Sequence, residues 1–555
     1  MGYTSLTLPR AAYTGKSGKT SLDGQVDLVR SGKAQSSMAT IEIVRGVAAS
    51  VGSSPLSKTR RRLSLSVGLG KNGRRNEKES ETPAHLRATL PLPVAFTAHI
   101  PPPSFVSTDH ILVQVFAVGL DALDSLIVQE KAGKRGSAGS VRGKKRGFIP
   151  GRSFVGRVAE CGFDVDSAVC KRGEWVVGLL DVRKCGALAE YVVIERHRMC
   201  RCKQPRTKGA TLFPPRQRTR TRTLSLPSQG NASEPSAPPP APNQLTPQDL
   251  ALIPLCGVPA HRAVRSFAEV IAARKGRGSR ARILILNAHD GAGAIALQML
   301  AKKKVNVCAQ VPESAVRDMD ESEESSEGSN SGASLTRRER VEARIRGWGA
   351  EEVFVGEPLA VLEQMFDEEK SFDGVLDTVG GVEIWEAAQR LLASYPSMSC
   401  AVSDAEDGGD EGRKRKTFVC PAQFTTLIGD MPSRAIPSAN ENIRLGLRSL
   451  RRAVSTSQAP AKGGRKRAKV KRMVGYAWVS VAAEVDEGED VRHSLATALE
   501  MVEGNKVRPW VGAEEDEDRV VTFERAPEAF RRAADGPRGV LQDAGTCVVK
   551  IGAWS

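Results

Sequence analysis

The chain has 555 residues and a formal net charge of +17 at pH 7, and 40% of its residues are hydrophobic. This length suffices for two or more domains, each with its own core. No run of about 18 uncharged apolar residues occurs, which argues against a transmembrane helix. The ten cysteines are scattered without a CxxC pair, which indicates a reducing compartment and neither a disulfide framework nor a zinc knuckle.

The excess of positive charge lies in three basic runs, at 131–146, 216–223 and 462–472. These runs belong to segments rich in Gly, Ser, Thr and Pro, which cannot bury enough apolar surface to fold. The last run, GRKRAKVKR, also resembles a nuclear import signal. No aromatic residues interleave with the basic runs, so the sequence does not favour a nucleic-acid partner.

Strand-like segments with glycine punctuation come first along the chain. HILVQVFAVGL (110–120) and EWVVGLLDV…GALAEYVVIE (174–195) are short and β-branched, and they predict a small antiparallel β domain. We read the biased stretches around them, about 31–90 and 203–247, as solvated insertions.

From about residue 248 helices and strands alternate. The sequence predicts helices at 249–271, from the loop after residue 286 to about residue 303, and at 340–349. It predicts strands at 282–286, 305–311 and 351–356, and a further strand within 372–381 that closes on a Gly turn. Such alternation implies a parallel sheet with helices on both faces. The stretches at 316–336, 403–416 and 455–472 are read as further insertions.

The stretch RILILNAHDGAGAIALQMLA (282–301) joins a strand to a helix through a turn of small residues. Gly291 to Ala296 match G-x-G-x-x-G/A in that context, which is typical of a dinucleotide-binding loop. Gly291 and Gly293 let the backbone approach the phosphates, and the helix N-terminus offers N–H groups to the anion. The same small residues also suit a purely structural turn.

Asp290 conflicts with this interpretation, because a carboxylate within a few Å of a pyrophosphate costs on the order of 1 kcal/mol or more. The alternative is that Asp290 turns back to bond the N–H groups of its own loop. His289 could offset the charge as a donor. We expect the loop still to bind a nucleotide.

The tip of the second strand decides between NADH and NADPH. An acid there, about 20 residues after the glycines, would bind the ribose diol. The expected position is near Val311, which is not acidic, while Ser314 and Arg317 could face a 2′-phosphate. These residues favour NADPH, and Glu313 is the counter-evidence.

Several segments resemble, in order, those of the medium-chain dehydrogenase/reductase superfamily, specifically its zinc-independent quinone-reductase (zeta-crystallin-like) branch. They are PRAAYTGKSG (9–18) as the opening strand, ILVQVFAVGLDALDSLI (111–127), IPGRSFVGRVAECG (149–162), KRGEWVVGL…GALAEYVVI (171–194), LDTVGG (376–381) and FERAPEAFRRAADG…GTCVVKI (523–551). Every long insertion falls between these segments.

The resemblance implies an α/β fold with a GroES-like, mainly β N-terminal domain and a doubly wound parallel-sheet Rossmann domain. The β domain takes residues 1–30 and 91–247, with 31–90 and 203–247 as disordered insertions. The Rossmann domain takes residues 248–480, with 316–336, 403–416 and 455–472 as insertions. Residues 481–555 return to the β domain.

The resemblance also assigns cofactor-binding residues. In the family's register the loop reads Ala288-x-x-Gly291-x-Gly293, so that Ala292 and Ala294 lie beside the phosphates. By resemblance, the residues lining the nicotinamide side are Thr378, Val379 and Gly380, and the next strand end is Phe418, Val419 and Cys420.

Departures from the superfamily's zinc enzymes limit the chemistry. Where those enzymes have Cys, His and Glu as ligands, this chain has Asp121, Arg152 and Ser153, and Leu123 replaces the hydroxyl of the proton relay. The four-cysteine zinc lobe is also absent from the sequence. We therefore expect no metal, and hydride delivery to an electron-poor acceptor instead of alcohol oxidation.

No convincing proton donor emerges from the sequence. The substrate loop has no Tyr, and Tyr191 lies in a strand of the β domain. Asp121 and Asp124 are the nearby acid candidates for catalysis. The competing interpretation is that they bond the loop backbone or pair with Arg152.

The leading hypothesis is thus a zinc-independent, NADPH-preferring (NADH possible) homodimeric reductase of quinones or activated enones. A non-catalytic nucleotide-binding or interaction protein on the same fold is the alternative, supported by Asp290, the missing Tyr and the insertions. Nucleic-acid association through the basic inserts is a third hypothesis.

The N-terminal stretch MGYTSLTLPRAAYTGK lacks the apolar core of a secretory signal. Its composition would suit a transit peptide, but an opening strand near Pro9 leaves little room for one. We therefore expect the protein to be located in the cytoplasm, or in the nucleus if the basic runs act as an import signal.

Overall fold

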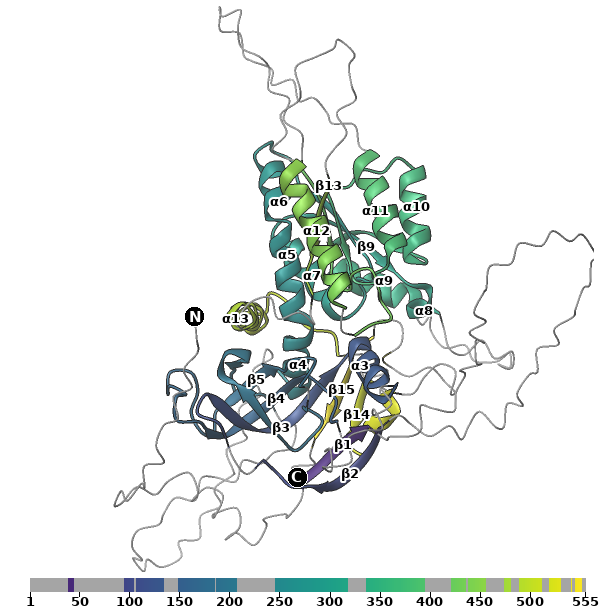
Figure 1. Ribbon diagram of the computed structural model, residues 1–555. Coiled ribbons are helices and arrows are strands. Elements are labelled where there is room, and N and C mark those ends of the chain that lie inside the picture. Colours follow the sequence, from purple (N-terminus) through teal and green to yellow (C-terminus); the bar gives the residue numbers. More distant parts are fainter. Residues whose placement is uncertain are drawn as a thin grey trace, which may run out of the picture.

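The computed structural model describes residues 38–43, 94–103, 106–133, 148–184, 186–206, 245–317, 336–394, 421–435, 438–455, 474–480, 489–511, 519–530, 541 and 545–551. Within these ranges, no helix is both long and apolar enough to cross a membrane. The chain forms a β domain below and a layered α/β domain above in the view of Figure 1.

The β domain is built on a seven-stranded sheet, ordered β14-β15-β3-β4-β5-β7 with β6 also paired to β3. Its strands are β3 (His110–Leu120), β4 (Ser153–Cys161), β5 (Trp175–Leu179), β6 (Tyr191–Glu195), β7 (Met199–Arg201), β14 (Val520–Thr522) and β15 (Cys547–Lys550). Neighbours are antiparallel except β14 and β15. The C-terminal strands thus complete the sheet begun by β3.

The α/β domain has a six-stranded parallel sheet ordered β10-β9-β8-β11-β12-β13. The strands are β8 (Arg282–Ile285), β9 (Asn306–Val311), β10 (Ala350–Val355), β11 (Gly374–Asp377), β12 (Ala422–Thr426) and β13 (Val474–Trp478). In chain order this is 3-2-1-4-5-6, the order of a doubly wound dinucleotide-binding fold. The predicted fold class is confirmed.

Helices cover both faces of this sheet, and Figure 1 shows α5, α6 and α12 on one side of α10 and α11. Their bounds are α5 (Val258–Ser266), α6 (Ala268–Lys275), α7 (Gly291–Lys302), α8 (Glu313–Val316), α9 (Arg337–Gly347), α10 (Pro358–Asp367), α11 (Val382–Ser394), α12 (Ala439–Ser455) and α13 (Glu489–Glu503). Side chains of β8 alternate between the two faces: Ile283 and Ile285 join one core, and Leu284 joins the other.

The helix expected over 249–271 is divided. Residues Pro247–Leu252 form α4, Ile253–Gly257 form a π-helical turn, and α5 and α6 follow. Pro254 and Pro259 lack the N–H that continues an α-helical ladder, which accounts for the interruption.

A strand lies where the sequence had indicated only a solvated insertion. Met38–Ile43 form β1, which pairs antiparallel with β2 (Val94–Ile100), and Ile41 N–H donates to Leu188 O at 2.9 Å. The expectation for 31–90 is therefore wrong at β1, because tertiary pairing outweighs the biased composition around a short apolar run. The stretch 9–18, expected to form the opening strand, lies outside the described residues.

The two domains share one core. Ala117, Val155 and Val177 of the β domain belong to the same buried cluster as the helices α4 and α5 and the strand β8. Ser153 Oγ donates to Ala251 O at 2.6 Å across the junction. Continuous apolar packing and a buried hydrogen bond hold the two domains against each other.

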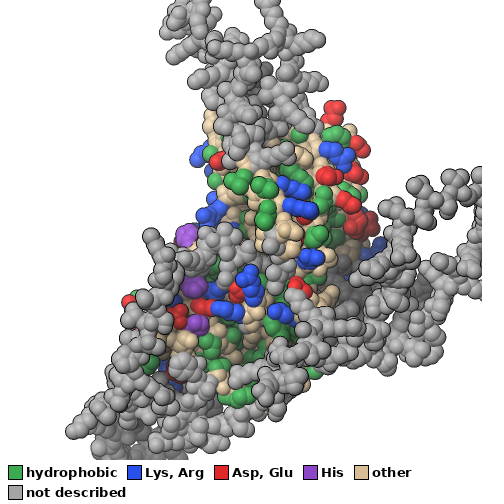
Figure 2. Space-filling view, in the orientation of Figure 1, with side chains coloured by type: hydrophobic (Ala, Val, Ile, Leu, Met, Phe, Trp, Pro, Cys, Tyr) green, Lys and Arg blue, Asp and Glu red, His purple; other side chains and the backbone are tan. Residues whose placement is uncertain are grey.

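Figure 2 shows hydrophobic and basic side chains over the part of the α/β domain where α12 runs, and acidic side chains along its right-hand edge. The apolar residues on α12 include Ile443, Leu447 and Leu450, whose side chains are 59%, 58% and 61% exposed, respectively.

Candidate functional site

The loop after β8 is held tightly against the second strand. Asn287 N–H donates to Gln310 Oε1 at 2.8 Å, and Ala288 N–H donates to Gln310 O at 2.9 Å. Gln310 is fully buried and its Nε2 donates to Gly356 O at 2.6 Å. The glutamine next to Val311 therefore shapes the loop, a role the sequence interpretation missed.

Glycine is required where helix α7 begins. A Cβ on Gly293 would lie 2.5 Å from Asn287 O, and Gly291 has a φ of 56°. Both observations agree with the predicted tight strand–turn–helix loop. The N–H groups of the first helical turn, including those of Ala292 and Gly293, have no intrahelical partner by geometry.

Asp290 caps this helix and is 3% exposed. Its carboxylate accepts hydrogen bonds from Gly291 N–H at 2.6 Å, from Thr546 N–H at 3.0 Å and Oγ1 at 2.9 Å, and from Arg519 Nη1 at 2.5 Å. The structure shows the alternative interpretation, in which Asp290 turns back onto its own loop, and it adds the C-terminal segment as a second set of partners.

The charge of Asp290 is compensated. Burial by itself would raise its pKa, but Arg519, His289 and the N–H groups of Thr546 and Gly291 outweigh burial and hold the pKa below its usual range. Asp290 is therefore ionised and paired with a guanidinium. Arg519 and Thr546 are 229 and 256 residues away in the chain, so no local pattern could have revealed them.

The predicted nicotinamide-side residues lie beside the predicted phosphate loop. Thr378 Oγ1 donates to Leu286 O at 2.8 Å, so the turn after β11 is tied to the end of β8. Fully buried Asp377 accepts from Val379 N–H and Gly380 N–H, each at 2.8 Å. Burial raises the pKa of Asp377, and these two N–H groups oppose that rise.

The turn also requires its glycine. Gly380 has a φ of 82°, and a Cβ there would lie 2.6 Å from Ile428 Cγ2. β8 and β11 are the neighbouring strands from which the chain runs outward in opposite directions, where doubly wound sheets bind ligands. Phe418, Val419 and Cys420, expected at the next strand end, lie outside the described residues.

At the tip of β9, Val311 is buried, Ser314 is half-buried, and Glu313 and Arg317 are exposed. Arg317 Nη2 lies 3.7 Å from a carboxylate oxygen of Glu313. This ion pair between neighbouring turns partly offsets the acid that had counted against a 2′-phosphate.

Asp121 and Asp124 flank the start of α3 (Ala122–Gly133) and bond each other's backbone. Asp121 N–H donates to Asp124 Oδ2 at 3.1 Å, and Asp124 N–H donates to Asp121 Oδ1 at 3.2 Å. Arg152, 1% exposed, donates to Asp121 Oδ2 at 2.5 Å and lies 3.7 Å from Asp124 Oδ1. The structure thus shows the arrangement of the competing interpretation: backbone bonds together with the Arg152 pair.

The buried triad does not fit a zinc ion, because a guanidinium offers five donors and no lone pair. Burial raises the pKa of Asp124 to about 8, although Arg152 opposes the rise. Asp124 is therefore protonated at neutral pH, beside a permanent cation. The hydroxyl of Ser153 donates its hydrogen bond to Ala251 O.

The sequence interpretation did not single out Cys256, a buried thiol. Burial raises the pKa of this thiol well above its ordinary range, with further contributions from Asp290 and Asp121 and an opposing one from Arg152. Cys256 lies in the π-helical turn and is within electrostatic reach of both the loop and the triad.

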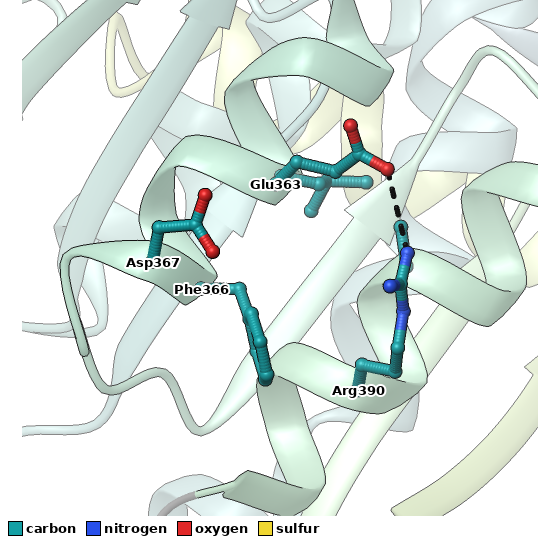
Figure 3. Close-up of a pocket in the computed structure, with 6 residues that line it drawn as sticks. Glu363, Phe366, Asp367 and Arg390 are labelled. Atoms are coloured by element: carbon teal, nitrogen blue, oxygen red, sulfur yellow. Dashed lines mark hydrogen bonds and ion pairs between the residues drawn. The ribbon is translucent and has the colours of Figure 1, made fainter.

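A separate groove lies between α10 and α11. It is lined by Leu362, Glu363, Phe366, Asp367, Ala387 and Arg390. Figure 3 shows Arg390 reaching toward Glu363, at 3.4 Å. Phe366 and Asp367 end α10, near the amino ends of the strands, whereas ligands bind at the carboxyl ends. This groove is not the candidate site.

No protein-family model matches the sequence. The chain is 24% identical over 452 residues to the mitochondrial NAD(P)H oxidoreductase RTN4IP1 of Danio rerio, covering 80% of this chain and 84% of that protein. Among solved structures, the Escherichia coli quinone oxidoreductase complexed with NADPH has a TM-score of 0.46 and 14% identity, covering 82% of this chain and 96% of that one.

The CurF ER cyclopropanase from the curacin A biosynthetic pathway has a TM-score of 0.47 and 14% identity, with 82% and 95% of the two chains covered. The long sequence match, the 3-2-1-4-5-6 sheet with its glycine loop, and the β domain completed by C-terminal strands agree with one another. In sequence and in fold the chain is thus similar to the NAD(P)H oxidoreductase of Danio rerio, in agreement with the superfamily resemblance of its segments.

Proposed function

We propose that this protein is a zinc-independent oxidoreductase that transfers a hydride from NADPH to a quinone or an activated enone. The observation that carries the proposal is the hydrogen bond from Thr378 to Leu286 O, at 2.8 Å. It holds the turn proposed for the nicotinamide beside the loop proposed for the phosphates. The NAD(P)H oxidoreductase of Danio rerio supports the same cofactor class.

The residues present fit a dinucleotide. The absence of a Cβ at Gly293 lets the first turn of α7 pack against the backbone of Asn287, and Asp290 is neutralised by Arg519. Ala292 and Gly293 would offer their helix N–H groups to the pyrophosphate, with Ala288, Gly291 and Ala294 forming the loop around it; the N–H of Gly291 already donates to Asp290. When bound, the nicotinamide supplies the hydride.

Residues at the edges of this site set orientation and cofactor choice. Thr378, Val379 and Gly380 would position the nicotinamide ring, because Asp377 fixes their backbone. Val311 would contact the ribose, and Ser314 with Arg317 would bind a 2′-phosphate. The presence of Ser314 and Arg317 at this position supports NADPH over NADH.

The acceptor class follows from the Asp121–Asp124–Arg152 triad. The buried guanidinium of Arg152 has no lone pair with which to bind zinc. Because a zinc ion would otherwise polarise an alcohol or ketone, the acceptor must itself be electron-poor. Asp124, with a pKa of about 8, holds a proton at neutral pH. We assign to it, with Asp121 as its positioning partner, delivery of the proton that completes reduction.

A fluorescence titration with NADPH and NADH tests the cofactor. We expect saturable binding that is tighter for NADPH, loss of both by Gly293→Asp, and loss of the NADPH preference alone by Ser314→Asp. Ser314 is only half-buried, so the second variant retains the fold even if Gly293→Asp does not. A folded wild-type protein that binds neither nucleotide would refute the proposal.

The second candidate is a non-catalytic nucleotide-binding or interaction protein on the same fold. Asp290 favours it, because its carboxylate takes the N–H of Gly291 that could otherwise face an anion. Oxidation of NADPH in the presence of a quinone or enone panel separates the candidates. Nucleotide binding without turnover of any acceptor supports the second.

We further propose a homodimer formed by pairing of the edge strand β13. β13 ends the sheet, and α12 packs on it while exposing Ile443, Leu447 and Leu450. Light scattering should give twice the monomer mass, and Leu447→Asp should shift it to the monomer. Phe163→Ser, at an 82% exposed position in the β domain, is the control that leaves the mass unchanged.

The cellular location needs its own test. The expected cytoplasmic location depended on an opening strand near Pro9, whereas the first described strand begins at Met38. The Danio rerio relative is mitochondrial by name. Cytoplasmic fluorescence of a full-length fusion supports the original expectation; mitochondrial fluorescence that is lost on removing residues 1–37 supports a presequence.

A further inference from the structure

Two thiols lie side by side at the far end of the β domain. Cys161 ends β4, Cys170 follows nine residues later, and their sulfur atoms are 3.7 Å apart. Ser153, at the other end of β4, contacts the α/β domain. The eight residue steps from Ser153 to Cys161 span about 26 Å of extended strand, so this pair is remote from the proposed cofactor site.

The backbone on both sides of the pair is fixed. Gly162 N–H donates to His110 O at 2.9 Å, directly after Cys161. Gly173 N–H donates to Val158 O at 2.8 Å, shortly after Cys170. A disulfide needs an S–S distance of about 2.0 Å, so the two sulfurs must approach from 3.7 Å, and the proposal requires that side-chain rotation achieves this while these bonds persist.

The two thiols are unequal. Cys161 is half-buried, and Cys170 is 2% exposed. The hydrogen bond between the two thiols lowers the pKa of Cys161 even though burial opposes it. The same hydrogen bond, together with burial, raises the pKa of Cys170. Cys161 is therefore the accessible nucleophile, and Cys170 is the thiol that resolves its adduct.

We propose that Cys161 and Cys170 form a reversible disulfide by exchange with a low-molecular-weight disulfide such as oxidised glutathione. The Cys161 thiolate attacks one sulfur of the oxidant, forms a mixed disulfide and releases one glutathione thiolate. Cys170 then loses its proton and attacks the Cys161 sulfur, which releases the second glutathione. Two protein thiols are oxidised, one oxidant disulfide is reduced, and the protons pass to the released thiolates.

Titration of the full-length protein with mixtures of reduced and oxidised glutathione tests this site. We expect the wild-type protein to lose two free thiols, with a single cross-linked peptide pair containing Cys161 and Cys170 in mass spectrometry. Reduced glutathione should restore both thiols.

Single variants test the order of events. Cys170→Ser should stop at a glutathione adduct on Cys161, whereas Cys161→Ser should leave Cys170 unmodified. Cys200→Ser with Cys202→Ser is the matched control, since that nearby half-buried pair should not change the outcome. A wild-type protein that keeps both thiols, or that forms its cross-link elsewhere, would overturn the proposal, and circular dichroism checks that each variant is folded.

Discussion

Asp290 illustrates how a residue that conflicts with a motif is accommodated by distant partners. Its carboxylate caps α7, while Arg519 and Thr546 bring a cation and two donors from the C-terminal segment. A buried charge with a full set of partners is stable, whereas the same charge without them is strongly destabilising. The residue is therefore a connection between the two domains as well as part of the loop.

Replacement of Asp290 by Ala should lower the free energy of unfolding by about 2–4 kcal/mol, because Thr546 and Arg519 lose a buried acceptor. Glu313→Ala, which breaks an exposed pair with Arg317, should cost less than about 1 kcal/mol. Urea unfolding measures both. Equal effects of the two variants would contradict the assigned role of Asp290.

Asp124 makes stability depend on pH in a defined direction. Burial raises its folded-state pKa to about 8, above its ordinary value. Its stabilising contribution is then full below about pH 4 and is lost as the pH rises toward the folded-state value.

We expect the wild-type free energy of unfolding to fall between about pH 5 and about pH 8, with a slope of at most about 1.4 kcal/mol per pH unit from this group. Asp124→Asn should flatten that slope, and kcat measured with an accepted substrate should lose its decline at alkaline pH. Urea titrations at several pH values give the first readout. Parallel curves for the two proteins would rule out Asp124 as the titrating group.

At the scale of secondary-structure elements, the strand–turn–helix unit from β8 to α7 depends on the space beside Gly293. A methyl group there would lie 2.5 Å from Asn287 O. The backbone of Asn287 cannot move aside as the end of a flexible side chain can, so the start of α7 would have to shift to accommodate the methyl group.

Gly293→Ala should therefore destabilise the protein by about 1–3 kcal/mol and weaken nucleotide binding. Gly446, inside α12, has open space around its Cβ position, so Gly446→Ala should stabilise by up to about 1 kcal/mol. Thermal melts with and without NADPH distinguish the two. A neutral Gly293→Ala would show that the loop is looser than this packing implies.

The elements were predictable to different degrees. Hydrophobic runs and helical periodicity identified the strands β8 to β11 and the helices α7 and α9 in the right order, but not the helix α10 between β10 and β11. The interruption at Ile253–Gly257 and the strand Met38–Ile43 were missed, since one depends on the placement of proline and the other on pairing with β2 and Leu188.

At the scale of the whole molecule, the two domains are joined through a common core. Apolar residues of β4 and β5 pack with α4 and α5, and two sets of polar contacts, Ser153–Ala251 and Asp290–Thr546, cross the junction. Interfaces of this kind restrict relative domain motion.

We expect both domains to unfold in one cooperative transition, with far-ultraviolet circular dichroism and tryptophan fluorescence changing at the same temperature. Ser153→Ala should lower that temperature, because Ala251 O would be left without its buried donor. Two separated transitions in the wild-type protein would contradict the shared core.

The sequence by itself determined the α/β alternation, the glycine loop and the absence of zinc-type ligands at Asp121, Arg152 and Ser153. These properties follow from local spacing and residue chemistry, which are legible along the chain. Only the tertiary structure decided that Arg519 and Thr546 neutralise Asp290, that Thr378 meets Leu286, and that Cys161 touches Cys170. Each of those contacts joins segments that only folding brings together, because sequence periodicity carries no information on which buried groups become neighbours.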